Sequence, residues 1–78
     1  MPLPTGDDLA NRFTYHPPTG DQPQRYEQIR AAGLDLACLL DRLCPPSRER
    51  SLALTNLEQV VMWANAAIAR NEKPEANA

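Results

Sequence analysis

The sequence predicts an all-α protein built on an antiparallel two-helix hairpin, and the placement of proline is the first observation behind this prediction. The prolines leave two long windows without proline, roughly Gln24 to Cys44 and Ser47 to Asn71, and such windows can form unbroken helices. Within each window apolar residues recur at alternating spacings of three and four, which is typical of one face of a helix. The short connection between the windows favours antiparallel helices.

The first long helix is expected over residues 23–44. Asp21 is a good N-cap, and Gln24 stands three residues later as its partner in a capping box. Pro23 falls in the first turn, where its missing N–H costs little. Cys44 precedes a proline, which ends the helix. The apolar stripe of this helix consists of Tyr26, Ile29, Gly33, Leu36, Leu40 and Leu43.

The second long helix is expected over residues 47–71. Ser47 can cap its first turn, and Glu49 is well placed beside the positive end of the helix dipole. Residues 72–78 are expected to form a flexible tail. The apolar stripe of this helix consists of Leu54, Leu57, Val61, Ala64 and Ile68.

The 78 residues leave room for one domain, which we expect to span the whole chain. Residues 1–22 are expected to form an ordered N-terminal arm ahead of the hairpin. This arm has room for a third, short helix from Asp8 to Arg12, capped from Gly6 or Asp7.

The two long helices carry more apolar surface than one seam between them would cover. The residues outside the stripes include Leu34, Cys38, Met62, Trp63 and Ala66. Two arrangements would cover them: the arm segment 13–18 could fold back over the hairpin, or the chain could self-associate. We favour a homo-oligomer, because a short hairpin with apolar residues around most of both helices is otherwise prone to aggregate.

Charge and cysteine usage narrow the class of protein. A formal net charge of -2 and a pI near 5.2 argue against DNA or RNA as a partner, since such binding needs a broad cationic face. Cys38 and Cys44 lie six apart without a second pair or a neighbouring histidine, which predicts reduced thiols. No apolar run is long enough for a membrane span or a secretory signal, so we expect a cytosolic protein.

The sequence does not predict an enzyme. His16 is the only histidine, and no Ser/Cys–His pairing, HExxH motif, glycine-rich phosphate loop or carboxylate cluster is visible. We therefore expect no catalytic residue, no metal site and no cofactor.

A binding site is predicted instead, around the arm and the start of the first long helix. Tyr15 and His16 precede two prolines, whose fixed φ angles hold the arm extended. Arg25 and Arg30 project from the first turns of the helix that follows. An aromatic ring near a guanidinium suits a nucleotide, because the ring stacks on the base and the guanidinium binds the phosphate.

Simpler interpretations of these side chains stay open at this point. Tyr15 can be an aromatic at the edge of the core with its hydroxyl in water, and His16 a polar loop residue. The two arginines can be solvated, or they can pair with a nearby carboxylate. The carboxylates in reach are Asp21, Glu27 and Asp35.

Two segments, NRFTYHPPTGDQPQRYEQIR and CPPSRERSLALTNLEQVVMWANAAIARNE, resemble the phage anti-CBASS sponge proteins of the anti-CBASS protein 2 type. These small helical proteins sequester the cyclic oligonucleotide signals of bacterial antiphage defence. The resemblance covers about Asn11 to Glu72. Two signatures carry it: YHPP followed shortly by GD and a helix, and the run from Ser51 to Asn71 that contains VMWANA.

The resemblance implies a hairpin with an N-terminal helix, assembled as a hexamer, that binds cyclic dinucleotides such as 3′,3′-cyclic GMP-AMP in pockets shared by two protomers. Some members also take cyclic trinucleotides at separate sites. Tyr15 matches the aromatic that stacks on a base. Arg30 falls where a phosphate-contacting basic residue is expected, and this residue is a lysine in one member of the family.

Other polar residues are assigned to the edges of this site or to a second one. Arg12, Arg25 and His16 are candidates for the rim of the cyclic dinucleotide pocket. Arg70 and Asn71 are candidates for a cyclic trinucleotide site, although a cation at position 70 is also favoured by the helix dipole alone.

The function implied is sequestration of the signal without cleavage, in the cytoplasm of the infected bacterial host, so that CBASS effectors are not activated. A structural or adaptor oligomer without a nucleotide ligand is the first alternative. A small hydrolase of cyclic nucleotides is the second.

Overall fold

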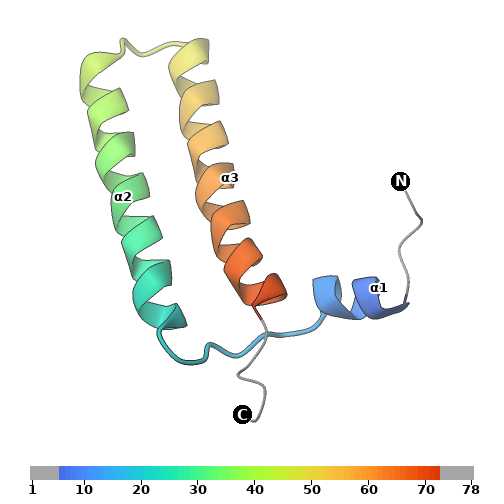
Figure 1. Cartoon of the computed structure of the whole chain (residues 1–78). Coiled ribbons are helices and arrows are strands. Elements are labelled where there is room, and N and C mark those ends of the chain that lie inside the picture. The colour runs from blue at the N-terminus through green and yellow to red at the C-terminus, as the bar shows by residue number, and fades with distance from the viewer. Residues whose placement is uncertain (1–5, 73–78) are drawn as a thin grey trace.

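The computed structural model describes residues 6–72, and within this range it contains three helices and no strand. The helices are α1 (Gly6–Phe13), α2 (Gln22–Leu43) and α3 (Arg48–Asn71). Figure 1 shows α2 and α3 side by side and antiparallel, with α1 standing apart near their lower end. The predicted all-α hairpin is thus confirmed. Positions 1–5 of the expected arm and 73–78 of the expected tail lie outside the described residues.

The bounds of the long helices lie within one residue of those expected. α2 begins one residue earlier than predicted and ends at Leu43, with the extended residue Cys44 as its C-cap. α3 ends where predicted, and Ser47 is its N-cap, because the Ser47 hydroxyl oxygen accepts a hydrogen bond from the Arg50 N–H at 3.1 Å. α1 extends beyond the predicted 8–12, and Gly6, expected as a cap, lies inside it.

The predicted capping box of α2 does not form. Asp21 occupies the N-cap position, but its side chain makes no capping hydrogen bond. Its carboxylate lies 3.1 Å from a terminal nitrogen of Arg25, four residues further along. Because this ion pair draws the carboxylate away from the backbone N–H groups of the first turn, Gln24 has no capping partner.

The connection between α2 and α3 is fixed by one arginine. The Nη1 of Arg50 donates to the carbonyl oxygens of Asp41 and Cys44, both at 3.2 Å. It also lies 3.5 Å from the Asp41 carboxylate. These carbonyl groups belong to the last turn of α2 and to its C-cap, where they have no partner inside the helix. The arginine therefore connects the end of one helix to the start of the next.

The two helices approach each other closely at a glycine. A Cβ atom added to Gly33 would lie 2.6 Å from Cγ2 of Val61. The residues beside this contact form two open apolar grooves, one on each face of the hairpin. The Arg30 groove, about 310 Å³, is lined by Arg30, Gly33, Leu34, Ala37, Leu54, Leu57, Glu58, Val61 and Met62. The Ile29 groove, about 260 Å³, is lined by Ile29, Ala32, Gly33, Leu36, Leu57, Val60 and Val61.

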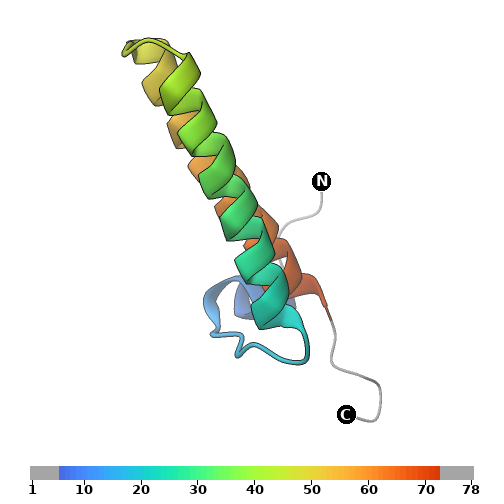
Figure 2. The same ribbon diagram turned by 90° about the vertical axis from the view of Figure 1, so that its left-hand side faces the viewer.

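In a single chain the apolar faces of the helices are exposed to solvent. Within residues 6–72 no hydrophobic side chain is buried, and Leu34 and Trp63 are 65% and 62% exposed. The helices that pack on each other are α2 and α3, while the segment before α2 loops at the lower end of the hairpin (Figure 2). The arm segment 13–18 therefore does not cover the apolar surface.

The molecule is accordingly elongated. Its radius of gyration is 16.3 Å, compared with about 11 Å for a compact domain of this length. A search of the described residues for a helix long and apolar enough to cross a membrane found none.

Candidate functional site

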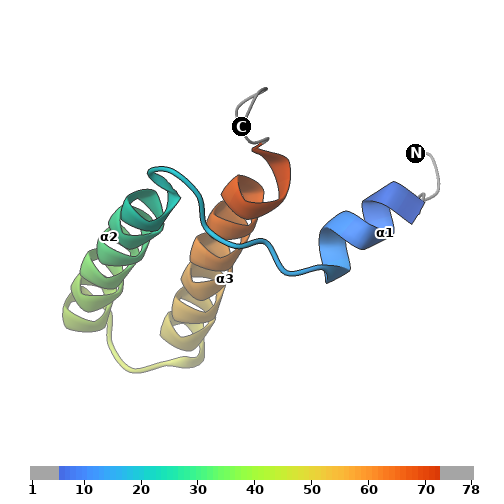
Figure 3. The same ribbon diagram turned by 90° about the horizontal axis from the view of Figure 1, so that it is seen from below.

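The segment that links α1 to α2, residues 14–21, passes across the C-terminal end of α3, as Figure 3 shows from below. We call this segment the arm linker. At its start, Nε2 of His16 donates to the carbonyl oxygen of Asn11 at 2.7 Å. At its end, Gly20 adopts a φ of +57°, and the Gln22 N–H donates to the Thr19 carbonyl oxygen at 3.0 Å. The linker is therefore attached at both ends.

Tyr15 stands on this linker next to His16, and 79% of its surface is exposed. It is not an aromatic at the edge of a core. His16 is half-buried, and because Nε2 faces a carbonyl oxygen, this nitrogen carries the proton. His16 thus joins the linker to the end of α1.

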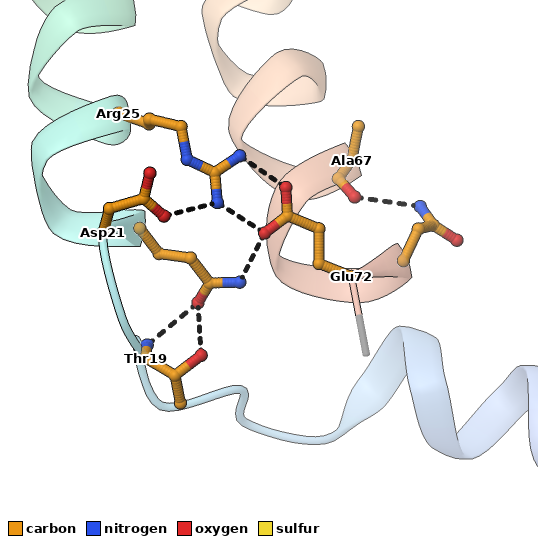
Figure 4. Close-up of polar contacts among 7 residues, drawn as sticks. Thr19, Asp21, Arg25, Ala67 and Glu72 are labelled. Carbon is orange, nitrogen blue, oxygen red and sulfur yellow. Dashed lines mark hydrogen bonds and ion pairs between the residues drawn. The ribbon is translucent and has the colours of Figure 1, made fainter. Parts of the chain in front are cut away.

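Arg25, a predicted rim residue, is engaged inside the chain. Its Nη2 lies 2.6 Å from Oε1 of Glu72 and 3.1 Å from the Asp21 carboxylate, and its Nη1 binds the other oxygen of Glu72 (Figure 4). The fork of two parallel hydrogen bonds is the strong form of an arginine–carboxylate pair. It joins the first turn of α2 to the end of α3.

The electrostatics of this cluster follow from the same contacts. The pKa of Glu72 is lowered to about 2, first because Arg25 donates hydrogen bonds to the carboxylate and then because the Gln22 amide does so too. The pKa of Arg25 is raised above its ordinary value, chiefly by the hydrogen bond to Glu72. Both groups are charged at neutral pH.

Arg30 lies five residues after Arg25 on α2, at the edge of the Arg30 groove. Its side chain is 58% exposed, and its Nη1 lies 3.3 Å from the Glu27 carboxylate. Such an exposed pair on one helix is weak, so the guanidinium can exchange this partner for a phosphate. The pairing with Glu27 agrees with one of the simpler interpretations.

The remaining predicted site residues lie on helix ends. Arg12, in the last turn of α1, lies 3.6 Å from the Asp8 carboxylate, with its guanidinium 5.6 Å from the centre of the Phe13 ring. Arg70 is half-buried in the last turn of α3. The Asn71 amide donates to the Ala67 carbonyl oxygen of the same helix at 3.1 Å, which leaves its own amide oxygen as an acceptor.

Among the described residues, Tyr15 does not belong to the lining of the Arg30 groove. Arg30 lines the groove between the helices, whereas Tyr15 stands on the arm linker beneath them. A smaller pocket of about 180 Å³ lies between the linker and α3. It is lined by His16, Pro17, Thr19, Gln22, Ala69 and Glu72.

Sequence reasoning missed two residues of this region, Gln22 and Glu72. Gln22 is the one buried side chain among the described residues, at 7% exposure. Glu72, expected in a flexible tail, is the C-cap of α3 and binds both Arg25 and Gln22. The sequence did contain a signal for this pair. In an antiparallel hairpin, Glu72 at the end of the second helix lies level with Arg25 in the first turn of the first helix.

The site offers an exposed ring on an anchored linker, an exposed guanidinium beside an apolar groove, and further cations at helix ends. Within residues 6–72 there is no group of three or more His, Cys, Asp or Glu side chains that could hold a metal ion. Features of this kind on a helical hairpin are suited to a planar, anionic ligand.

A scan against protein families matches residues 6–69 to the Acb2/Tad1 hairpin domain. The match includes the arm linker and almost all of both hairpin helices. The chain therefore belongs to this family, the anti-CBASS protein 2 family of cyclic-oligonucleotide sponges. Searches of the curated proteins and of the solved structures found no match.

Proposed function

We propose that this protein binds cyclic dinucleotides such as 3′,3′-cyclic GMP-AMP and sequesters them without cleavage, so that CBASS effectors in the infected host are not activated. The observation that carries the proposal is the Tyr15 ring, 79% exposed on a linker attached at both ends, in a chain of the Acb2/Tad1 family. An exposed ring held in place offers a stacking platform for a base.

Arg30 supplies the phosphate contact in this proposal. Its guanidinium is exposed, and its partner within residues 6–72 is Glu27 in one weak pair. Tyr15 is not among the described residues that line the Arg30 groove, so in this proposal the complete site takes the ring from one protomer and the groove from another. A 3′,3′-cyclic dinucleotide is close to two-fold symmetric, so a two-fold interface can supply one ring per base and one cation per phosphate.

The remaining predicted residues take supporting roles in the proposal. Arg12, His16 and Arg25 stand at the rim, where Arg25 acts mainly through its internal ion pair. Arg70 and Asn71 form a separate site for cyclic trinucleotides, supported by their adjacent positions in the last turn of α3. The protomers assemble as an even-numbered homo-oligomer, a hexamer, which covers the open apolar grooves.

Calorimetric titration with 3′,3′-cyclic GMP-AMP tests the proposal, followed by denaturation of the complex and mass spectrometry of the released nucleotide. We expect saturable binding and return of the intact ligand. A linear product would favour the hydrolase, and no binding by the correctly assembled protein would favour the adaptor.

Tyr15→Ala should weaken this binding by about 1–3 kcal/mol for each stacked base, whereas Tyr15→Phe, which keeps the ring, should bind nearly as tightly as the unmodified protein. Both substitutions alter an exposed side chain, so circular dichroism should show unchanged helix content. Equal affinity of the alanine variant and the unmodified protein would remove Tyr15 from the site.

A further inference from the structure

Gln22, in the first turn of α2, makes hydrogen bonds both to the arm linker and to the end of α3. Its Oε1 accepts hydrogen bonds from the backbone N–H and the hydroxyl of Thr19, at 3.0 and 3.3 Å. Its Nε2 donates to Oε1 of Glu72 at 3.0 Å. Figure 4 shows Thr19 and Glu72 held in this network together with Arg25. The arm linker, the first turn of α2 and the end of α3 therefore meet at one amide.

The burial of this amide is unusual for the molecule. Among residues 6–72 Gln22 alone is buried, while every hydrophobic side chain keeps some exposure. A buried amide costs free energy unless its hydrogen bonds are made, and here both ends of the amide have partners. The contact with Glu72 is reinforced, because the bidentate pair with Arg25 holds the carboxylate in place.

The two attachments of the arm linker affect the position of the Tyr15 ring. The His16–Asn11 hydrogen bond attaches the linker on one side, and the Thr19–Gln22 contacts attach it on the other. Between His16 and Thr19 stand only Pro17 and Pro18, whose φ angles are fixed. The position of the neighbouring Tyr15 ring then depends on whether both attachments hold.

We propose that Gln22 is a positioning residue, which holds the arm linker against the end of α3 and thereby presents the Tyr15 ring for stacking. This inference rests on the proposed function, since it assigns to Gln22 a role at the same site without contact to the ligand. A linker that is already ordered loses little conformational entropy when the ligand binds. Releasing it lowers the fraction of chains that are ready to bind.

Gln22→Met tests this role, because methionine keeps the length and helix propensity of glutamine but cannot form its hydrogen bonds. Gln24→Met is the matched control, since Gln24 is exposed in the same turn of α2. The first measurement needs no ligand: hydrogen exchange of the Thr19 amide. We expect this amide to be protected in the unmodified protein and in the control, and to exchange rapidly in Gln22→Met.

The second measurement is the affinity for 3′,3′-cyclic GMP-AMP in three backgrounds. With Tyr15 in place, Gln22→Met should weaken binding on the order of tenfold. In a Tyr15→Ala background the same change should have little further effect, because no ring is left to position. In an Arg30→Ala background the tenfold loss should persist, because Arg30 does not depend on the linker.

The backgrounds distinguish positioning from a general structural effect. An equal loss in all three backgrounds, or rapid Thr19 exchange with unchanged affinity, would overturn the proposal. If Gln22→Met does not fold, Glu72→Ala removes the other partner of Gln22 at the end of α3 and should give a smaller change in the same direction. If the unmodified protein does not bind the ligand, the proposed function and the ligand-positioning role of Gln22 are both overturned. Hydrogen exchange of the Thr19 amide would still decide, by itself, whether Gln22 holds the linker.

Discussion

At the scale of single residues, the arginines of the chain divide into two kinds. Arg25 and Arg50 bind partners across the hairpin. The partner of Arg30 in the described part of the chain is the exposed Glu27 on the same helix. The guanidinium group is the same in all three residues, but they differ in how readily it can bind a ligand phosphate. A ligand with phosphate groups gains most from a cation that does not have to abandon a strong partner.

Arg30→Ala should therefore weaken cyclic dinucleotide binding, and the loss should shrink as salt is raised, because salt screens an exposed charge. Arg30→Lys should recover part of the affinity, since it keeps the charge but not the fork. Calorimetric titration over a salt series measures both effects. Arg42→Ala is the control, because Arg42 is an exposed arginine at the far end of α2. A loss that is the same at all salt concentrations would contradict a charge-based contact.

Glu72 should titrate with a pKa of about 2, because Arg25 and Gln22 stabilise its charged form. Its unfolded value is near 4.3, so its contribution to stability is full above that pH and is lost as the pH falls towards 2. Carboxyl chemical shifts measured by NMR check the value. Arg25→Ala should move the pKa of Glu72 back up, and Glu72→Gln should lack this part of the acid sensitivity. An unshifted Glu72 would show that the bidentate pair does not persist in solution.

At the scale of elements, the helix bounds were predictable and the contacts at the open end of the hairpin were not. Prolines and apolar spacing act locally, so they specify α2 and α3 to within one residue. The N-cap position of α2 was predicted correctly at Asp21, but its side-chain capping was not, because Arg25 competes for the Asp21 carboxylate.

The Gln22–Glu72 contact joins positions 50 apart in the sequence. Propensity and periodicity carry no information on such pairs, which only the antiparallel packing brings together. For the same reason the sequence could suggest Tyr15 and Arg30 as site residues but could not show that Tyr15 is absent from the described lining of the Arg30 groove.

The close approach of α2 to α3 makes Gly33 a test of the packing. Alanine at this position gains about 1 kcal/mol of helix propensity, but its Cβ would lie 2.6 Å from Cγ2 of Val61, a stiff branched side chain. Overpacking of this kind costs about 1–3 kcal/mol, so Gly33→Ala should lower the free energy of unfolding overall. In a Val61→Ala background the same change should become favourable. Urea unfolding at fixed protein concentration measures both, and a stabilised Gly33→Ala with Val61 present would exclude the close contact.

At the scale of the whole molecule, the exposed apolar surface is the dominant feature. The hairpin has an open groove on each face, and Leu34 and Met62 at the rim of one of them are 65% and 59% exposed. Monomeric proteins rarely leave such continuous apolar surface in water. The arm does not cover it, so the proposed homo-oligomer is the arrangement that would.

Light scattering on the unmodified protein should therefore give an even multiple of the 8.7 kDa chain mass, with six copies expected. Leu34→Glu places a charge in the Arg30 groove, where burial against another chain would remove it from water, so this variant should give a smaller species. It should also weaken cyclic dinucleotide binding, because the proposed site takes its ring and its groove from different chains. Gln28→Glu, an exposed position on the same helix that gains the same charge, should keep both mass and affinity. A monomer mass for the unmodified protein at micromolar concentration would contradict the assembly. If the Leu34→Glu variant has a reduced mass but binds the ligand with full affinity, the site does not need residues from a second chain.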